Sequence, residues 1–213
     1  EDASFSSEFP GLSEAAGLIG SDQIQNRSSL GGNLCNGSPA ADSVPAMVVN
    51  DVRAVVGGPS GTRVVDVSDV VTGPGQTVLD ADEFIVEFEI DRMPSRSGDA
   101  YLRMIPRTEM DIAVVGAGAR VTLGEDGSIE QAAIALGAVA PTVVRVPAAE
   151  EALIGTTATE DTLAAVAEAA SAACNPIDDK RGTVAYRKQV AGVLAKRAVL
   201  IAIERAEQRN GAN

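Results

Sequence analysis

The 213-residue sequence contains no histidine and only two cysteines, Cys35 and Cys174. Because histidine is the usual general base, its absence argues strongly against hydrolysis by a catalytic triad. Two cysteines without histidine also cannot supply the four ligands of a structural zinc or iron–sulfur site. We therefore predict two free thiols, one near a loop and one at the end of a helix, and no metal site in this chain. If the chain is part of an enzyme, a cofactor must supply the chemistry.

Positive charge and long apolar segments are also scarce. Lys and Arg total 17 against 30 Asp and Glu, so the formal net charge is -13. Without a sizeable basic run, nucleic acid and anionic membrane surfaces are not expected partners. No apolar run approaches the roughly 20 residues that cross a bilayer, and the N-terminal segment EDASFSSEFP is acidic. These features predict a cytoplasmic protein without a transmembrane segment. The hydrophobic fraction of 45% is enough for a real core.

The first half of the chain alternates between helical, loop-like and strand-like patterns. Apolar residues at helical spacing predict a helix over residues 10–19, with Pro10 in its first turn. Residues 21–43 are rich in Gly, Ser, Asn and Pro, and we predict a long loop of the kind that often carries function. A helix follows to Asn50, with Asp42 or Ser43 as its N-cap.

Three strands and a linker are predicted next. The strands cover residues 53–56, 63–67 and 83–90, and the last one alternates Phe84, Val86, Phe88 and Ile90 with Ile85 and glutamates, as a half-buried strand would. Residues 92–99 are polar and contain Pro94 and Gly98, which is typical of a linker. We therefore predict two domains, residues 1–95 and 96–213.

The second half reads as strands followed by helices. Residues 111–123 and 129–139 are β-rich runs around Gly124-Glu125-Asp126-Gly127, which predicts an antiparallel hairpin. Helices are predicted over residues 148–154, 159–173 and 186–207. This order indicates the α+β class.

The segment most informative about chemistry is Ser29-Leu30-Gly31-Gly32-Asn33. Two adjacent glycines let the backbone approach a ligand closely and point successive N–H groups at an anion, while Ser29 and Asn33 can add hydrogen bonds. Phosphate is the natural ligand of such a loop. From these five residues alone a plain Gly-Gly turn is the favoured interpretation, because short glycine motifs occur often by chance.

The wider stretch QIQNRSSLGGNLCNGSPAAD, residues 23–42, resembles the second FAD-binding motif in the medium subunits of carbon monoxide dehydrogenase, xanthine dehydrogenase and their relatives. The resemblance continues through residues 83–90, through RTEMDIA at 107–113 and through 137–142, and it spans residue 9 to about 205. Gln25 and Ser28 depart from the family pattern, which commonly has Arg and Gly there. The family's earlier glycine-rich loop, in an N-terminal subdomain, has no counterpart here, so we expect these 213 residues to hold FAD weakly or not at all.

The resemblance implies an FAD-binding subdomain of the CO dehydrogenase flavoprotein type, followed by an α+β C-terminal domain with an antiparallel sheet and helices. It also implies a set of cofactor contacts. Ser29, Gly31, Gly32 and Asn33 would hold the FAD pyrophosphate with the backbone of Leu30, Asp42 would hydrogen-bond the cofactor, Ile19 and Ile85 would pack on it, and Arg103 would approach the flavin.

Several of these residues also have simpler explanations. Asp42 could act only as an N-cap, Ile19 as a helix core residue and Arg103 as a solvated arginine. Arg107 and Glu109 could form an ordinary surface pair, and Asp111 is predicted at a strand start without a catalytic role. No catalytic residue is predicted.

The function implied by the resemblance is electron transfer by a flavoprotein subunit of a molybdenum-containing hydroxylase. Its partners would be a molybdopterin large subunit and a small subunit with 2Fe-2S clusters, assembled as a dimer of heterotrimers. A non-catalytic scaffold module of the same fold, without flavin, is the alternative, and a stand-alone enzyme with another phosphate ligand is a third hypothesis. The sequence predicts neither the hydroxylated substrate nor the final electron acceptor.

Overall fold

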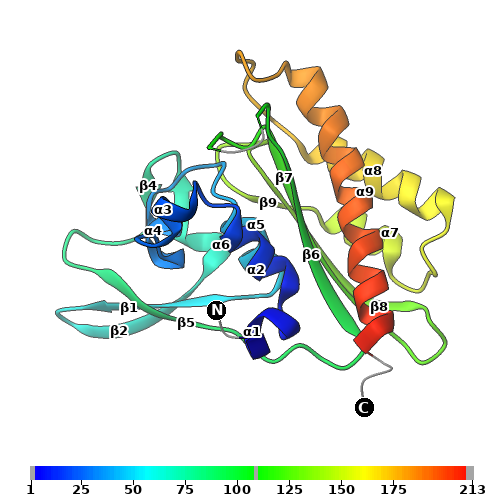
Figure 1. The fold of residues 1–213 in the computed structure, drawn as a ribbon, viewed down its shortest axis with the longest axis horizontal. Helices are drawn as coiled ribbons and strands as arrows, with labels where there is room; N and C mark the ends of the chain where they lie inside the picture. The colour runs from blue at the N-terminus through cyan, green and yellow to red at the C-terminus, as the bar shows by residue number, and fades with distance from the viewer. Residues whose placement is uncertain (1–2, 108–109, 210–213) are drawn as a thin grey trace.

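The computed structural model describes residues 3–107 and 110–209 and has the predicted α+β fold (Figure 1). The N-terminal part, residues 3–96, contains helices α1 (Ala3–Glu8), α2 (Pro10–Gly17), α3 (Asp22–Gln25), α4 (Leu30–Cys35), α5 (Ser43–Val49) and α6 (Val67–Val70), and strands β1 (Arg53–Gly58), β2 (Gly61–Asp66), β3 (Val71–Gly73), β4 (Gln76–Thr77) and β5 (Phe84–Glu89). The C-terminal part, residues 97–209, contains β6 (Ser97–Met104), β7 (Val115–Leu123), β8 (Ile129–Gly137), β9 (Val144–Arg145), α7 (Pro147–Leu153), α8 (Glu160–Ala173) and α9 (Val184–Gln208).

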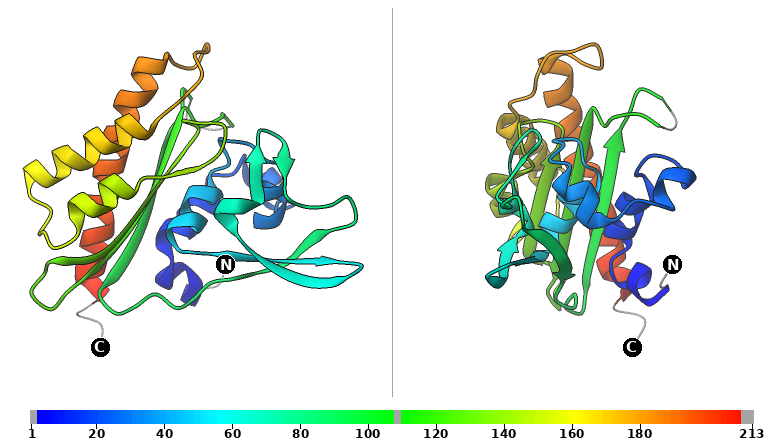
Figure 2. Two further views of the ribbon diagram at one scale, coloured as in Figure 1. Left: turned by 180° about the vertical axis from the view of Figure 1, so that it is seen from behind. Right: turned by 90° about the vertical axis from the view of Figure 1, so that its left-hand side faces the viewer.

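A four-stranded antiparallel sheet of the C-terminal part, in the order β6-β7-β8-β9, lies between helices α7 to α9 and the N-terminal part. Helices α7 to α9 cover one of its faces, and α2 and α5 pack on the other (Figure 1). Figure 2 shows from behind that the β2-β1-β5 sheet lies on the side opposite α9. Along β8, Ile134 belongs to the core under α7 to α9, while the neighbouring Ala133 and Ala135 belong to the core shared with α5. The alternation of strand side chains therefore lets one sheet serve two cores.

Helix α5 is the centre of the N-terminal part, and all seven of its residues are buried. Glycines on the sheet make room for it, because a Cβ at Gly118 would lie 2.9 Å from the carbonyl oxygen of Pro45, and one at Gly137 would lie 2.9 Å from Cγ of the same proline. The backbone of α5 can therefore lie close to β7 and β8.

Most predicted elements are present. The predicted helices correspond to α2, α5, α7, α8 and α9, and the hairpin of β7 and β8 turns at Gly127, which has a φ of +82°. Both cysteines are free thiols, with Cys35 at the end of α4 and Cys174 at the C-cap of α8. In the described part of the chain, no helix is long and apolar enough to cross a membrane.

The linker predicted over residues 92–99 is wrong from Ser97 onward, because strand β6 begins there and Ser97, Gly98 and Asp99 are buried. Tertiary contacts account for these polar and small residues. Ser97 shares a hydrogen bond with Thr122, and a Cβ at Gly98 would meet Cβ of Arg205 at 2.8 Å. The domain division at residues 95 and 96 stays a prediction.

Two local predictions also need correction. The segment 21–43 is not a continuous loop, because it contains α3 and α4. Strand β5 does not bury Phe84 and Val86, which are 64% and 53% exposed, while Ile85 and Phe88 are half-buried. The pairing with β1 skips Val86, and this bulge shifts the inward-facing set by one residue.

The segment before β7 also differs from the prediction. The strand begins at Val115, so Asp111 lies in a loop, where it accepts a bond from Arg107 Nε at 3.1 Å. The predicted pair of Arg107 with Glu109 falls on a position outside the described residues.

Candidate functional site

The segment Ser29-Leu30-Gly31-Gly32-Asn33 forms the start of helix α4. Ser29 is the N-cap, and its hydroxyl accepts the N–H of Gly32 at 3.0 Å. The N–H groups of Leu30 and Gly31 belong to the first turn, where a helix offers no acceptor. These two backbone donors are therefore available to an anionic ligand.

Neither Gly31 nor Gly32 is required by the fold of the chain itself. Neither has a positive φ. A Cβ on Gly31 would meet Ile85 at an ordinary 3.9 Å, and one on Gly32 would have a single close contact, 3.3 Å from the Ser29 hydroxyl. Glycine inside a helix costs about 1 kcal/mol relative to alanine. Contacts within the described part of the chain therefore do not explain this pair.

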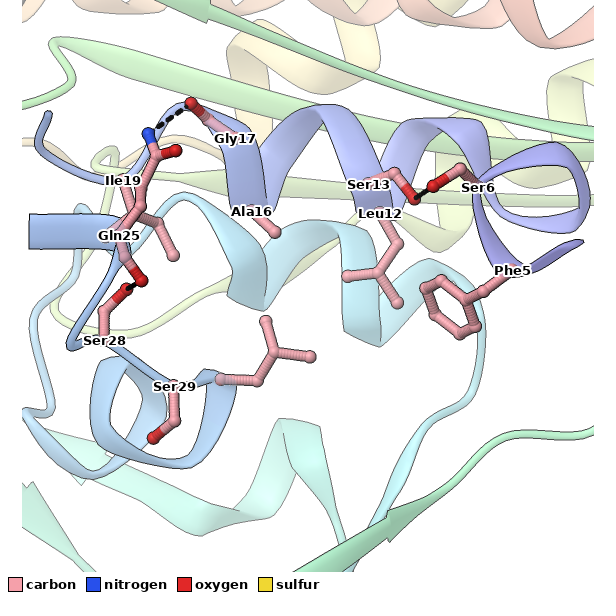
Figure 3. A pocket seen from close by; sticks show the side chains of 11 residues that line it. Phe5, Ser6, Leu12, Ser13, Ala16, Gly17, Ile19, Gln25, Ser28 and Ser29 are labelled. Atoms are coloured by element: carbon pink, nitrogen blue, oxygen red, sulfur yellow. Dashed lines mark hydrogen bonds between the residues drawn. The ribbon is translucent and has the colours of Figure 1, made fainter. Parts of the chain in front are cut away.

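A cavity of about 360 Å³ opens beside this helix (Figure 3). It lies between α2 and α4, with Ile19, Gln25, Ser28 and Ser29 toward one end and Phe5 toward the other. The full lining consists of Phe5, Ser6, Leu12, Ser13, Ala16, Gly17, Ile19, Gln25, Ser28, Ser29 and Leu30. The cavity thus combines apolar walls with hydroxyl groups next to the start of α4.

Gln25 and Ser28, the two departures from the family pattern, both line this cavity. The Gln25 side chain donates to the carbonyl oxygen of Gly17 at 2.7 Å and ties α3 to the end of α2. The Ser28 hydroxyl makes a longer bond, 3.4 Å, to the carbonyl oxygen of Gln25. Both positions depart from the family pattern, but the sequence does not indicate that they face a common cavity.

Asp42 is buried, with 8% of its surface exposed, and lies in a hydrogen-bonded cluster with β6. One carboxylate oxygen accepts the hydroxyl of Tyr101 at 2.8 Å, and the other accepts Nη1 of Arg103 at 2.7 Å. Burial raises the pKa of Asp42, and the bonds from Tyr101 and Arg103 partly oppose this rise. Burial likewise raises the pKa of Tyr101 well above its usual value, so the phenol keeps its proton.

The contacts of this cluster rule out the simpler explanations of Asp42 and Arg103. Asp42 occupies the N-cap position of α5 but makes no side-chain capping bond, so the pure N-cap explanation is wrong. Arg103 is not a solvated arginine, because only 8% of its side chain is exposed and it is paired with Asp42. Both side chains are held in fixed positions by the fold.

The predicted site residues form two neighbouring groups. Ile19, Ser29 and Leu30 line the cavity, and Gly31 lies against Ile85 of β5. Asn33 accepts the Ser43 hydroxyl at 2.7 Å, which connects α4 to the residue after Asp42. The other predicted site residues do not line this cavity, namely Gly31, Gly32, Asn33, Asp42, Ile85 and Arg103.

Tyr101 was missed by the sequence analysis. It precedes Arg103 by two positions on β6, and residues two apart on a strand point to the same face. Asp99, two positions earlier, also faces the N-terminal part and accepts the N–H groups of Gly11 and Leu12 at 2.9 and 3.2 Å. Recognition of β6 as a strand would have revealed this polar stripe.

Comparison with known families gives two matches that together cover most of the chain. Residues 2–92 match the FAD binding domain in molybdopterin dehydrogenase, and residues 100–202 match the CO dehydrogenase flavoprotein C-terminal domain. The xanthine dehydrogenase FAD-binding subunit of Escherichia coli O157:H7 is 30% identical over 204 residues, which cover 95% of this chain and 70% of that protein. The carbon monoxide dehydrogenase medium chain of Hydrogenophaga pseudoflava is 33% identical over 192 residues, covering 90% and 66%.

Solved structures agree with these matches. Carbon monoxide dehydrogenase from Hydrogenophaga pseudoflava, in a form that lacks the Mo-pyranopterin moiety, superposes with a TM-score of 0.91 at 33% identity and covers 96% of this chain and 70% of that one. Quinoline 2-oxidoreductase from Pseudomonas putida 86 superposes with a TM-score of 0.88 at 27% identity, covering 97% and 71%. The chain thus spans about two thirds of the length of such relatives.

Proposed function

Because this chain belongs to the family of FAD-binding subunits of molybdenum hydroxylases, we propose that it serves as the electron-transfer flavoprotein of such an enzyme. When bound, FAD supplies the redox chemistry, accepting electrons from iron–sulfur clusters of a partner and passing them to an external acceptor. The residues of this chain bind and orient the cofactor. No side chain of the described part is assigned an acid or base role.

The observation that carries this proposal is the pair of glycines in the first turn of α4. Their missing side chains leave the N–H groups of Leu30 and Gly31 open to an approaching pyrophosphate, and Ser29 holds the turn in place. Asn33 stabilises the arrangement from the far side through Ser43. Backbone donors at a helix start are a common phosphate-binding arrangement.

The remaining residues would position the rest of the cofactor. Ile19 offers an apolar contact from the cavity wall, and Ile85 supports the glycine turn from below. Arg103 donates to Asp42 through Nη1, while Nε and Nη2 have no acceptor among the described residues and can meet a flavin oxygen. In this proposal Asp42 orients Arg103 and hydrogen-bonds the cofactor.

The proposed partners are a molybdopterin large subunit and a small subunit with 2Fe-2S clusters, in a dimer of heterotrimers. An assembly of several subunits is supported by two relatives, the medium chain of carbon monoxide dehydrogenase and the FAD-binding subunit of xanthine dehydrogenase. Co-expression with the neighbouring genes should yield a complex of the three subunits. A chain that elutes as a monomer under those conditions would favour the scaffold alternative. The cytoplasmic location stays a prediction from the sequence.

Gly32→Val in the intact subunit tests the glycine pair. A side chain at this exposed position would occupy the space that the pyrophosphate needs, so we expect loss of bound FAD, measured by flavin absorbance after purification. Cys35→Val is the matched control, since it places valine at another exposed position of the same helix. Stoichiometric flavin in Gly32→Val would refute the assignment, and flavin loss in both variants would point to helix destabilisation instead.

A further inference from the structure

A second cavity, of about 600 Å³, lies where the loop between β6 and β7 meets the loop between α8 and α9, at the upper end of the molecule in Figure 1. The segment from Ser38 to Ala40 and the segment after β8 complete its walls. The two cavities have no lining residue in common. A ligand of this second cavity would therefore not compete directly for the wall that faces α4.

The walls of the second cavity are mostly apolar. Four prolines contribute to them, Pro39, Pro74, Pro141 and Pro176. Ile112 and Ile177 extend the apolar surface and are 53% and 69% exposed. The volume falls within the range of about 300–1,000 Å³ that small-molecule sites occupy. The cavity can thus enclose an apolar ligand body.

Two arginines line the cavity, and their guanidinium groups differ in how many hydrogen bonds they make within the protein. Arg187 is 3% exposed and is saturated by the protein, with Nη1 donating to the carbonyl oxygen of Val114 at 2.7 Å and Nη2 to Asp179 at 2.7 Å. Arg181 makes one side-chain contact, from Nε to Asp111 at 3.4 Å. Its Nη1 and Nη2 have no acceptor among the described residues, and 27% of the side chain is exposed. Arg181 therefore has a free donor pair at the cavity.

Three arginines share two carboxylates in the ion pairs that the structure describes near the cavity. Arg107, Arg181 and Arg187 are paired with only two carboxylates, Asp111 and Asp179. Backbone N–H bonds are the main reason that the pKa of each aspartate lies below its ordinary value, so both carboxylates are ionised at neutral pH. Arg181 can therefore pair with a further carboxylate through Nη1 and Nη2 without losing its bond to Asp111.

We propose that this cavity binds a small organic carboxylate with an apolar body. The free Nη1 and Nη2 groups of Arg181 match the two oxygens of a carboxylate, a geometry that arginine forms readily. The exposed side chain of Asn175 lines the same cavity and offers a further donor. The apolar body of the ligand lies between Ile112, Ile177 and the proline walls.

The test compares 4-butylbenzoate with its neutral isostere 4-butylbenzamide by titration calorimetry on the intact flavin-loaded protein at low salt. We expect the carboxylate to bind about tenfold or more tightly than the amide, because the charge-assisted pair exists only for the carboxylate. Arg181→Gln should remove this preference, and Ala140→Phe, which fills the cavity wall, should abolish binding of both compounds.

Arg92→Gln is the matched control, because it removes an arginine whose side chain is 92% exposed and which is not among the cavity residues. It should keep the preference for the carboxylate unchanged. Equal binding of acid and amide, or a preference that survives Arg181→Gln, would overturn the proposal. Binding that persists in Ala140→Phe would also overturn it, by placing the compounds elsewhere on the protein. Flavin absorbance of each variant shows that these outcomes are independent of FAD retention.

Discussion

The start of α4 and the centre of β8 are held in place in different ways. On β8, Ile134, Ala135 and Leu136 are fully buried and contact helices on both sides of the sheet. In α4, Leu34 is the one buried residue among six, and two of the others are glycines without a packing role. The backbone of β8 is therefore specified by side-chain packing within the chain. The first turn of α4 is specified much less by packing, and in the proposed function it binds the cofactor.

The same contrast appears within the single strand β6. Its even-numbered residues from Gly98 to Met104 face α9 and the C-terminal core, and they are small or apolar. Its odd-numbered residues Asp99, Tyr101 and Arg103 face the N-terminal part and bond to α2 and Asp42. Strand β6 thus contributes apolar side chains to the C-terminal core on one face. Its polar side chains on the other face contact the N-terminal part, where the candidate site lies.

The largest effect on the free energy of unfolding should come from a substitution in the buried core of β8. Ile134→Ala removes a fully buried side chain under α7 to α9, and we expect a loss of about 4 kcal/mol in the free energy of unfolding, measured by urea denaturation. Phe84→Ala, on the exposed face of β5, should change it by less than about 0.5 kcal/mol. If the two substitutions lower the free energy of unfolding equally, the contrast between the buried core and the exposed strand is wrong.

A smaller loss in the free energy of unfolding is expected for a polar residue of β6 that faces the N-terminal part. Asp99 is fully buried and accepts the N–H groups of Gly11 and Leu12, as well as the Asn50 amide at 2.9 Å. Asp99→Ala leaves these donors unpaired, which should cost roughly 2–3 kcal/mol. Asp91→Ala is the control, because its carboxylate is 85% exposed and makes only a 3.5 Å pair with Arg53. A near-zero effect of Asp99→Ala in thermal unfolding would show that α2 docks without this carboxylate.

Tyr101→Phe tests the cluster that holds Asp42, with a smaller effect still. The variant removes one of the two hydrogen bonds that oppose the burial-driven rise in the Asp42 pKa, so this pKa should rise further. We expect a loss of about 1 kcal/mol in stability and weaker FAD retention than in Tyr186→Phe, the control on the exposed second tyrosine. Equal flavin content in both variants would separate Asp42 from the cofactor site.

The sequence predicted elements whose signals are local and missed those whose stability comes from distant contacts. Helices with a 3.6-residue apolar period and the Asp-Gly hairpin were found because pattern and turn chemistry lie within a few residues. Strand β6 was missed because Ser97, Gly98 and Asp99 resemble a linker until Thr122, Arg205 and α2 are placed beside them.

The candidate site was predicted unevenly for the same reason. The motif identified Ser29 to Asn33, since the glycine pair is visible in the sequence itself. The motif match also identified Asp42 and Arg103, but their pairing spans 61 positions and is not readable from spacing. Tyr101, which completes that cluster, had no local signal without its strand.

The smallest predicted effect is the pH dependence of an ion pair beside β5. Glu83 accepts both Nε and Nη2 of Arg63, at 2.8 and 2.7 Å, and the N–H of Asp80 at 2.9 Å. The bond from Arg63 is the main reason that the pKa of Glu83 falls from its ordinary 4.5 to about 2. A lowered folded-state pKa stabilises the protein above the unfolded pKa and loses this contribution as pH falls toward the folded value. The difference in unfolding free energy between the wild type and Glu83→Gln should therefore become smaller as the pH is lowered from 5 to 2. Urea unfolding at each pH measures this difference. Glu125→Gln on the exposed hairpin turn serves as the control. A difference that stays constant with pH would show that the ion pair of Arg63 with Glu83 contributes nothing to stability.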